Sequence, residues 1–222
     1  MPLVVEAAVL DAKPGAVRVD RSPFFPGGGG QLADRGVIAW SGGEVALAAV
    51  EGDWLSFDGD ARPEGRLLLT VDAGFRGLMS ELHTVAHIVN SVVFTQFGAP
   101  LTGAQLSADG ALRVDFDLPG ADNDRLRALE DPLNAVIASD LAVAAHLIPR
   151  AVAEATPGLF RSKSVAPPVQ ADGMVRVVEI AGLDRQACGG THLTSTGRSR
   201  RVRILKVENK GRHNRRVRIG LG

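Results

Sequence analysis

His83-Thr84-Val85-Ala86-His87 is the stretch around which the rest of the sequence is organised. It lies in a proline-free run, residues 75–94, whose apolar side chains recur at helical spacing, so we predict a helix. Side chains four residues apart lie on one face of a helix, one turn apart, so both imidazoles can reach the same ion. A single pair of this kind on a buried helix is weak support for a metal site, and further ligands are needed.

A second segment, Cys188-Gly189-Gly190-Thr191-His192, supplies a thiol and a third imidazole. Its two glycines allow a tight backbone turn. The chain has one cysteine and five histidines, and four of these six residues fall into two pairs at i,i+4 spacing. Three imidazoles and a thiolate suit Zn²⁺. The sequence therefore predicts a zinc site formed by His83, His87, Cys188 and His192.

The residue after the first histidine argues against one class of zinc enzyme. In peptidases with the His-Glu-x-x-His motif, the glutamate that follows the first histidine is the general base. Thr84 occupies that position in this chain and cannot serve as such a base. We therefore do not expect a peptidase.

Composition sets broad limits on function. The chain has 222 residues, a length that fits one domain or two small ones. Its 25 basic and 25 acidic side chains balance, so no net positive charge would attract a polyanionic partner. No apolar run approaches the ~20 residues that span a bilayer, and residues 1–6 lack the features of a signal peptide. A lone cysteine cannot form an internal disulfide. We expect a cytoplasmic protein with no membrane partner and no obligatory protein partner.

Turn signals divide the chain near residue 72 into two expected domains, residues 1–71 and 72–222. The first is β-rich, and a small barrel or compact sheet is expected. Asp72 is expected to cap the metal-bearing helix that follows. The strands predicted in the first domain are residues 4–9, 16–19, 36–40, 44–51 and 66–71.

The second domain is expected to be α+β, with an antiparallel sheet and the metal-bearing helix. A β-hairpin is predicted to turn at Asp109-Gly110. The helical pattern of residues 122–141 is expected to be split or kinked at Pro132, and residues 162–173 are expected to form a loop. The other predicted elements are strands at 102–107, 111–117, 143–148, 174–180, 202–207 and 216–219 and a short helix at 150–155.

Four consecutive glycines, residues 27–30, precede Gln31 in the first domain. Such a run exposes backbone N–H groups and allows a ligand or another backbone to approach closely. It is not a phosphate-binding P-loop, because no Gly-Lys-Ser/Thr follows, and no helix follows to make a dinucleotide fingerprint. A flexible turn is the alternative interpretation.

Residues 198–218 form a basic tail with ten Lys and Arg residues and one acid, Glu208. A basic ribbon beside a metal site indicates a substrate that carries phosphates. The alternative is a solvated face whose charge is balanced by acids from elsewhere in the fold.

Three separated segments resemble one family. The histidine pair and the Cys188–His192 motif are similar to the paired motifs of the editing domain shared by alanyl- and threonyl-tRNA synthetases. The segment Phe24-Phe25-Pro26-Gly27-Gly28-Gly29-Gly30-Gln31, followed by Asp34 and Gly36, resembles the glycine-rich segment of the alanyl branch. Residues 112–117 and 210–217 are also similar to that branch. Because no stretch is long enough for an aminoacylation domain, the chain resembles the freestanding alanyl-tRNA editing proteins.

The resemblance implies a trans-editing hydrolase that deacylates tRNA-Ala wrongly charged with serine or glycine. It implies Zn²⁺ as the cofactor and the mischarged tRNA-Ala as the partner. Four protein ligands would close the zinc shell, so either one of them binds weakly, with His192 the candidate, or the metal expands its coordination. The further residues that we assign are Gln105 and Thr191 as catalytic and Gly28, Gly29, Gly30, Gln31, Arg215 and Arg216 as substrate-binding. The alternatives are an ordinary strand residue facing water for Gln105 and a hydrogen bond to the local backbone for Thr191.

Two departures from the family pattern bear on amino-acid preference. Phe25 stands where the family usually has a tyrosine, and Gly27 where it has a hydroxylated or acidic residue. Three other interpretations stay open: an RNA-binding module with a structural zinc, a zinc hydrolase of another small ester or amide, and editing of Ser-tRNA-Thr. Zinc binding without hydrolysis favours the first, and activity independent of RNA favours the second.

Overall fold

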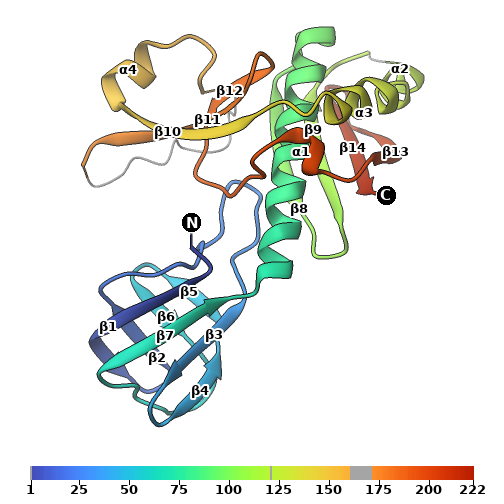
Figure 1. Ribbon diagram of the computed structural model, residues 1–222. Helices are drawn as coiled ribbons and strands as arrows, with labels where there is room; N and C mark the ends of the chain where they lie inside the picture. The colour runs from blue at the N-terminus through green and yellow to red at the C-terminus, as the bar shows by residue number, and fades with distance from the viewer. Residues whose placement is uncertain (1, 121, 161–171) are drawn as a thin grey trace. The chain divides into compact units, whose positions relative to one another are not determined.

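The computed structural model describes residues 2–120, 122–160 and 172–222. It is an α+β fold, as the sequence predicts (Figure 1). The chain divides into two compact units: unit 1 comprises residues 1–28 and 32–78, and unit 2 comprises residues 29–31 and 79–222. The tip of the glycine-rich segment thus belongs to unit 2, although its flanks belong to unit 1. In the described part of the chain, no helix has the length and apolarity needed to cross a membrane.

Unit 1 is a curled, seven-stranded antiparallel sheet with the order β4-β3-β7-β1-β2-β6-β5 (Figure 1). This half-barrel agrees with the predicted barrel or compact sheet. Its interior is filled by apolar side chains such as Val17, Ile38, Leu55 and Leu69. The strands are β1 (Val4–Lys13), β2 (Ala16–Val19), β3 (Gly36–Trp40), β4 (Gly43–Ala46), β5 (Ala49–Glu51), β6 (Trp54–Ser56) and β7 (Arg66–Val71).

The single strand predicted at residues 44–51 is two strands at opposite edges of this sheet. The chain passes from one edge strand of the sheet to the other between Leu47 and Ala48. The Leu47 N–H donates to the Gly36 carbonyl beside β3, whereas the Ala48 N–H donates to the Ser56 carbonyl of β6. The two edges of the curled sheet are therefore joined through this short connection, which apolar patterning alone did not indicate.

A buried ion pair fixes the base of the glycine-rich segment within unit 1. The Asp34 carboxylate pairs with the Arg76 guanidinium, and their side chains are only 0% and 8% exposed. The same carboxylate accepts the Phe25 N–H at 2.5 Å, and Arg76 also donates to the Pro23 carbonyl at 2.8 Å. Arg76 stands in the first turn of the long helix α1 (Ala73–Phe97), which Asp72 caps by accepting the Phe75 N–H.

Unit 2 contains two antiparallel sheets, with strand orders β13-β14-β9-β8 and β10-β11-β12. Residues 79–93 of α1 are all buried in unit 2, including several polar side chains. The strands are β8 (Leu101–Leu106), β9 (Ala111–Asp117), β10 (Val143–Pro149), β11 (Met174–Ile180), β12 (Asp184–Ala187), β13 (Val202–Lys210) and β14 (Asn214–Leu221). The short helices are α2 (Asn123–Arg127), α3 (Glu130–Ala138), α4 (Arg150–Ala155) and the 3₁₀ turn η1 (Thr196–Arg198).

The predicted break at Pro132 is misplaced by a few residues. Helix α2 ends at Arg127 and α3 begins at Glu130, so Pro132 lies in the first turn of α3. A proline is tolerated there because N–H groups in the first turn have no partner within the helix. The loop predicted at residues 162–173 falls almost entirely outside the described residues, and the division of the chain at residue 72 stays a prediction.

The substitution Asp34→Ala is expected to destabilise unit 1 by about 3–5 kcal/mol, because it leaves the Arg76 charge buried without its carboxylate. Both tryptophans, Trp40 and Trp54, lie in unit 1, so fluorescence during urea unfolding reports on this unit. The control is Asp11→Ala, which breaks the exposed pair with Arg18 and should cost less than about 1 kcal/mol. Equal losses for both variants would contradict the assigned role of the buried pair.

Candidate metal centre

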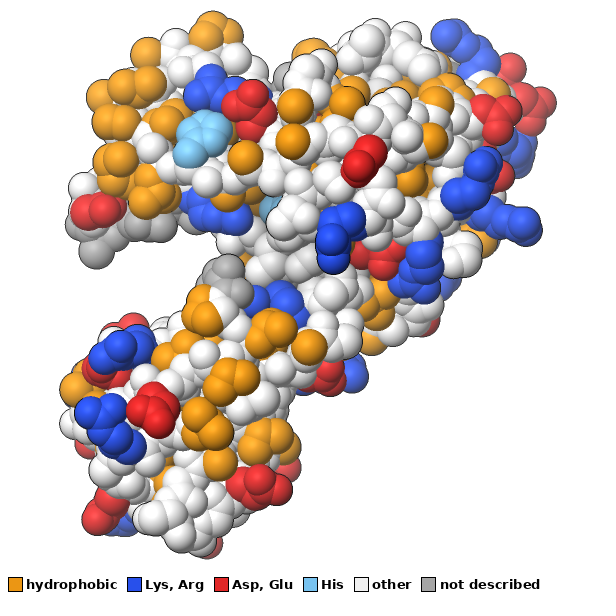
Figure 2. Space-filling view, in the orientation of Figure 1, with side chains coloured by type: hydrophobic (Ala, Val, Ile, Leu, Met, Phe, Trp, Pro, Cys, Tyr) orange, Lys and Arg blue, Asp and Glu red, His pale blue; other side chains and the backbone are white. Residues whose placement is uncertain are grey.

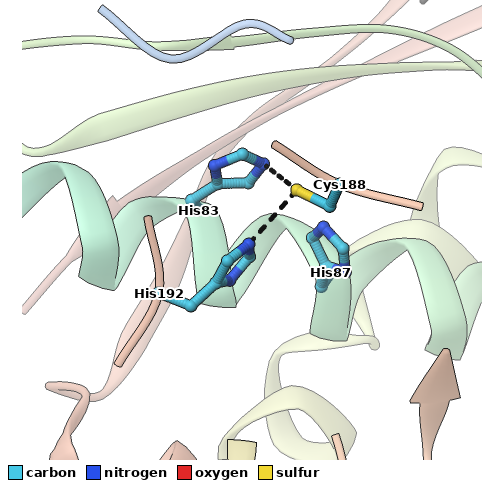
Figure 3. Close-up of side chains that lie close together, drawn as sticks. All are labelled: His83, His87, Cys188 and His192. Carbon is cyan, nitrogen blue, oxygen red and sulfur yellow. Dashed lines mark hydrogen bonds between the residues drawn. The ribbon is translucent and has the colours of Figure 1, made fainter. Parts of the chain in front are cut away.

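Four side chains from three places in unit 2 converge (Figure 3). His83 and His87 project from consecutive turns of α1, Cys188 directly follows β12, and His192 lies in the loop beyond it. One ligand atom from each residue lies within 4.8 Å of all the others. The Cys188 Sγ lies 3.5 Å from His83 Nε2 and 3.3 Å from His192 Nε2. The structure therefore brings together the four predicted ligands as a cluster that could hold a metal ion.

Each imidazole is held through its other ring nitrogen. His83 Nδ1 lies 2.8 Å from Gln31 Oε1, and His87 Nδ1 lies 2.9 Å from Asp184 Oδ2. His192 Nδ1 lies 3.3 Å from the Thr84 hydroxyl oxygen. Such outer partners fix the orientation of metal-binding histidines and leave Nε2 for the metal. The pattern is shared by all three imidazoles, and it fits a metal site better than three unrelated buried histidines.

The surroundings of Cys188 favour its thiolate form, which is the form that binds a metal ion. Burial would raise the pKa of the Cys188 thiol, but the charge of His83 and hydrogen bonds from His192, His83 and His87 outweigh it and lower that pKa to about 2. Burial would lower the pKa of His87, but hydrogen bonds to Asp184 and Cys188 raise it to about 9. Burial and the charge of His83 lower the pKa of His192 to about 3. The cluster thus combines a thiolate with imidazoles, a donor set that suits Zn²⁺.

The glycines of the cysteine segment have a packing role. A Cβ at Gly190 would collide with the His83 ring and lie 2.8 Å from Gln31 Oε1. The segment is also held from outside, because the Arg176 guanidinium on β11 donates to the Cys188 carbonyl at 2.7 Å and the Gly190 carbonyl at 2.8 Å. A side chain at residue 190 would therefore displace one of the predicted ligands.

The other predicted site residues fall into two groups. Gln31 and Thr191 belong to the same buried network as the cluster: the Gln31 amide donates to the Thr191 hydroxyl at 2.9 Å, and Ser80 donates to that hydroxyl at 2.8 Å. Gly30 lies against the backbone of Ala104. Around Gly28 and Gly29, in contrast, a Cβ would meet no atom within 4 Å.

Three predicted residues lie outside this network. Gln105 is exposed on β8. Arg215 is buried on β14, and its neighbour Arg216 forms two hydrogen bonds to the Asp115 carboxylate, at 2.7 and 3.0 Å. Their catalytic and RNA-binding roles stay predictions.

Two functional candidates were missed from the sequence. Asp184 is fully buried, holds His87 and accepts two hydrogen bonds from Gln186, at 3.0 and 2.8 Å. Arg176 holds the cysteine segment. In the structure Asp184 and Gln186 lie on the buried face of β12 and Arg185 on the exposed face. All three side chains are polar, so the sequence does not indicate which face of the strand is buried.

The substitution Cys188→Ala is expected to lower the bound zinc strongly, because it removes the thiolate from the donor set. Metal content after equilibration with zinc, measured by atomic emission, checks this. The control is His213→Ala, at an exposed histidine outside the cluster, which should retain the wild-type content. Full zinc content in Cys188→Ala would exclude the cysteine as a ligand.

Comparisons with known proteins agree with this site. Residues 175–218 match the family model described as "Threonyl and Alanyl tRNA synthetase second additional domain". This range contains Cys188, His192 and the whole basic tail.

Several curated relatives match over nearly the whole chain. The alanyl-tRNA editing protein AlaX-M of Methanosarcina acetivorans is 35% identical, over 90% of this chain and 86% of that protein. AlaX-M of Saccharolobus solfataricus is 32% identical, over 96% of this chain and 91% of its own length. The alanine–tRNA ligase of Thermofilum pendens is 36% identical over 91% of this chain, which corresponds to 23% of the ligase. The chain therefore belongs to the alanyl-tRNA editing protein family, as a homologue of the AlaX-M proteins.

Proposed function

We propose that this protein is a trans-editing hydrolase that cleaves the aminoacyl ester of tRNA-Ala wrongly charged with serine or glycine, with Zn²⁺ as its cofactor. The observation that carries the proposal is the buried cluster of three histidines and one cysteine in a chain of the alanyl-tRNA editing family. We infer the tRNA substrate from the names of the relatives and the metal from the set of donor atoms.

The chemistry of selection explains why such an activity is useful. A pocket built for alanine cannot strongly exclude glycine, which is smaller, or serine, which adds one hydroxyl group. A second site can separate serine from alanine if it hydrogen-bonds the serine hydroxyl, because alanine would leave that polar partner unsatisfied. Alanine would therefore bind this second site less favourably than serine, and correctly charged Ala-tRNA-Ala would be spared.

In this proposal His83, His87, Cys188 and His192 hold the zinc ion. A zinc ion held there would supply Lewis-acid chemistry toward a carbonyl group or a water molecule. Four protein ligands leave no open position in a tetrahedral shell. His192 is our candidate for the weak ligand, because its Nδ1 contact of 3.3 Å is longer than those of His83 and His87, at 2.8 and 2.9 Å.

Two polar residues are proposed to act on the substrate. The Thr191 hydroxyl accepts hydrogen bonds from Gln31 and Ser80, so its oxygen is fixed in position within the buried network. Its own hydroxyl hydrogen can then be directed to a substrate oxygen. Gln105, exposed on β8, is proposed to orient water or the aminoacyl group. The glycine backbone at residues 28–30 is proposed to lie against the substrate.

The direct test is deacylation of seryl-, glycyl- and alanyl-tRNA-Ala with and without a chelator. We expect serine to be released rapidly, alanine to be spared, and the chelator to abolish release until zinc is restored. Ser-tRNA-Thr serves as the control for the tRNA. Zinc binding without cleavage of any ester would contradict the proposal and favour a binding module, whereas equal cleavage of a small ester without RNA would favour a different hydrolase.

The basic tail gives a second expectation, for binding rather than cleavage. Within the described part of the chain, five of its ten basic residues form ion pairs: Arg200, Lys206, Lys210, Arg216 and Arg218. On the face shown in Figure 2, basic and acidic side chains are likewise interspersed. These pairs reduce the tail's net charge, so phosphate binding would depend on particular arginines rather than on an overall field.

We expect Arg215→Ala combined with Arg216→Ala to weaken tRNA binding and to reduce the slope of log affinity against log salt by up to about two. Guanidinium groups suit bidentate phosphate contacts, and zinc content should stay unchanged. The comparison variant is Arg203→Ala with Arg212→Ala, which removes the same charge from two exposed positions of the tail. A slope that changes only in the comparison variant would show that the RNA lies on those exposed residues instead.

A further inference from the structure

The structure assigns Gln31 to the metal centre, as the residue that sets the tautomer and orientation of His83. This assignment deepens the proposed function and rests on its metal site. It differs from the substrate contact predicted for Gln31, because the side chain is 3% exposed and its amide is bonded to the protein.

The orientation of the Gln31 amide follows from one backbone group. The Thr191 N–H can only donate, and the amide atom 3.0 Å from it is therefore the oxygen, Oε1. The amide nitrogen, Nε2, then faces the Thr191 hydroxyl at 2.9 Å. The two contacts with Thr191 thus fix the oxygen and nitrogen ends of an amide that is otherwise easily assigned the wrong way round.

The fixed amide determines which nitrogen of the His83 ring faces Gln31 with a hydrogen. The same Oε1 lies 2.8 Å from His83 Nδ1, and an amide oxygen can only accept. His83 therefore carries a hydrogen on Nδ1, so Nε2 is the ring nitrogen left to bind a metal ion. Nε2 lies 3.5 Å from the Cys188 Sγ.

The neighbouring glycines hold Gln31 in this position. The Gly30 carbonyl accepts the Leu106 N–H at 2.8 Å, and Gly30 has a φ of +86°. A Cβ on Gly30 would collide with the Ala104 carbonyl, so the glycine permits this close contact with β8. Gly190 makes room for His83 and Gln31 in the same way. Part of the glycine-rich segment is thus explained by the metal centre itself.

The test is metal affinity in the absence of tRNA, measured with Co²⁺ in place of Zn²⁺ and by competition with a coloured zinc chelator. We expect Gln31→Leu to weaken zinc binding by about 10- to 100-fold and to change the visible Co²⁺ spectrum. Gln31→Glu should remain within a few-fold of wild type, because a carboxylate still accepts from both N–H groups. The matched control is Gln96→Leu, at an exposed glutamine of α1, which should leave affinity unchanged.

Wild-type zinc affinity in Gln31→Leu would overturn the assignment. If that variant fails to fold, judged by circular dichroism, the ¹⁵N spectrum of the histidine rings in the unsubstituted, metal-free protein decides. Hydrogen on Nδ1 of His83 supports the assignment, and hydrogen on Nε2 alone overturns it. A wild-type protein that binds no zinc would refute the cofactor of the proposed function, whereas this ring tautomer can still be read independently.

Discussion

Burying a thiolate among three imidazoles is the constraint on which the organisation of unit 2 depends. Charged and polar groups lose hydration when they are buried, and they are tolerated only when other groups compensate. Here His83 and His192 contact the Cys188 sulfur, and each ring is held on its opposite side by a further polar group. A cation bound between them would complete this compensation. The same arrangement that makes the cluster tolerable in the interior therefore makes it suitable for a metal ion.

The outer partners extend this constraint through the fold. Asp184 on β12 holds His87 and is itself held by Gln186, whose amide oxygen accepts a hydrogen bond from Asn90 on α1. Thr84 accepts the Leu193 N–H and lies beside His192. The helix, the short strand and the cysteine segment are thus linked by polar contacts as well as by apolar packing. A fully satisfied buried network of this kind favours one arrangement of its members.

Much of the fold could be predicted from the sequence because it depends on local spacing, and each of the two ligand pairs in the metal cluster has a local i,i+4 signature. The i,i+4 histidines require only a helix, and strands such as Gly36–Trp40 alternate within a few residues. The partners of the ligands depend instead on tertiary contacts between distant segments. Asp184 and Gln31 reach histidines 97 and 52 residues away, and no local pattern reports such pairing. For the same reason the break in residues 44–51, where the chain changes sheet edge, could not be seen in its apolar pattern.

X-ray absorption at the zinc edge of the purified protein tests the central claim most directly. We expect a shell of one sulfur at about 2.3 Å and imidazole nitrogens at about 2.0–2.1 Å. In any zinc that Cys188→Ala still retains, the sulfur contribution should be absent. A wild-type spectrum with only nitrogen and oxygen neighbours, or a protein that retains no zinc after loading, would contradict the assignment of His83, His87, Cys188 and His192 as a zinc centre.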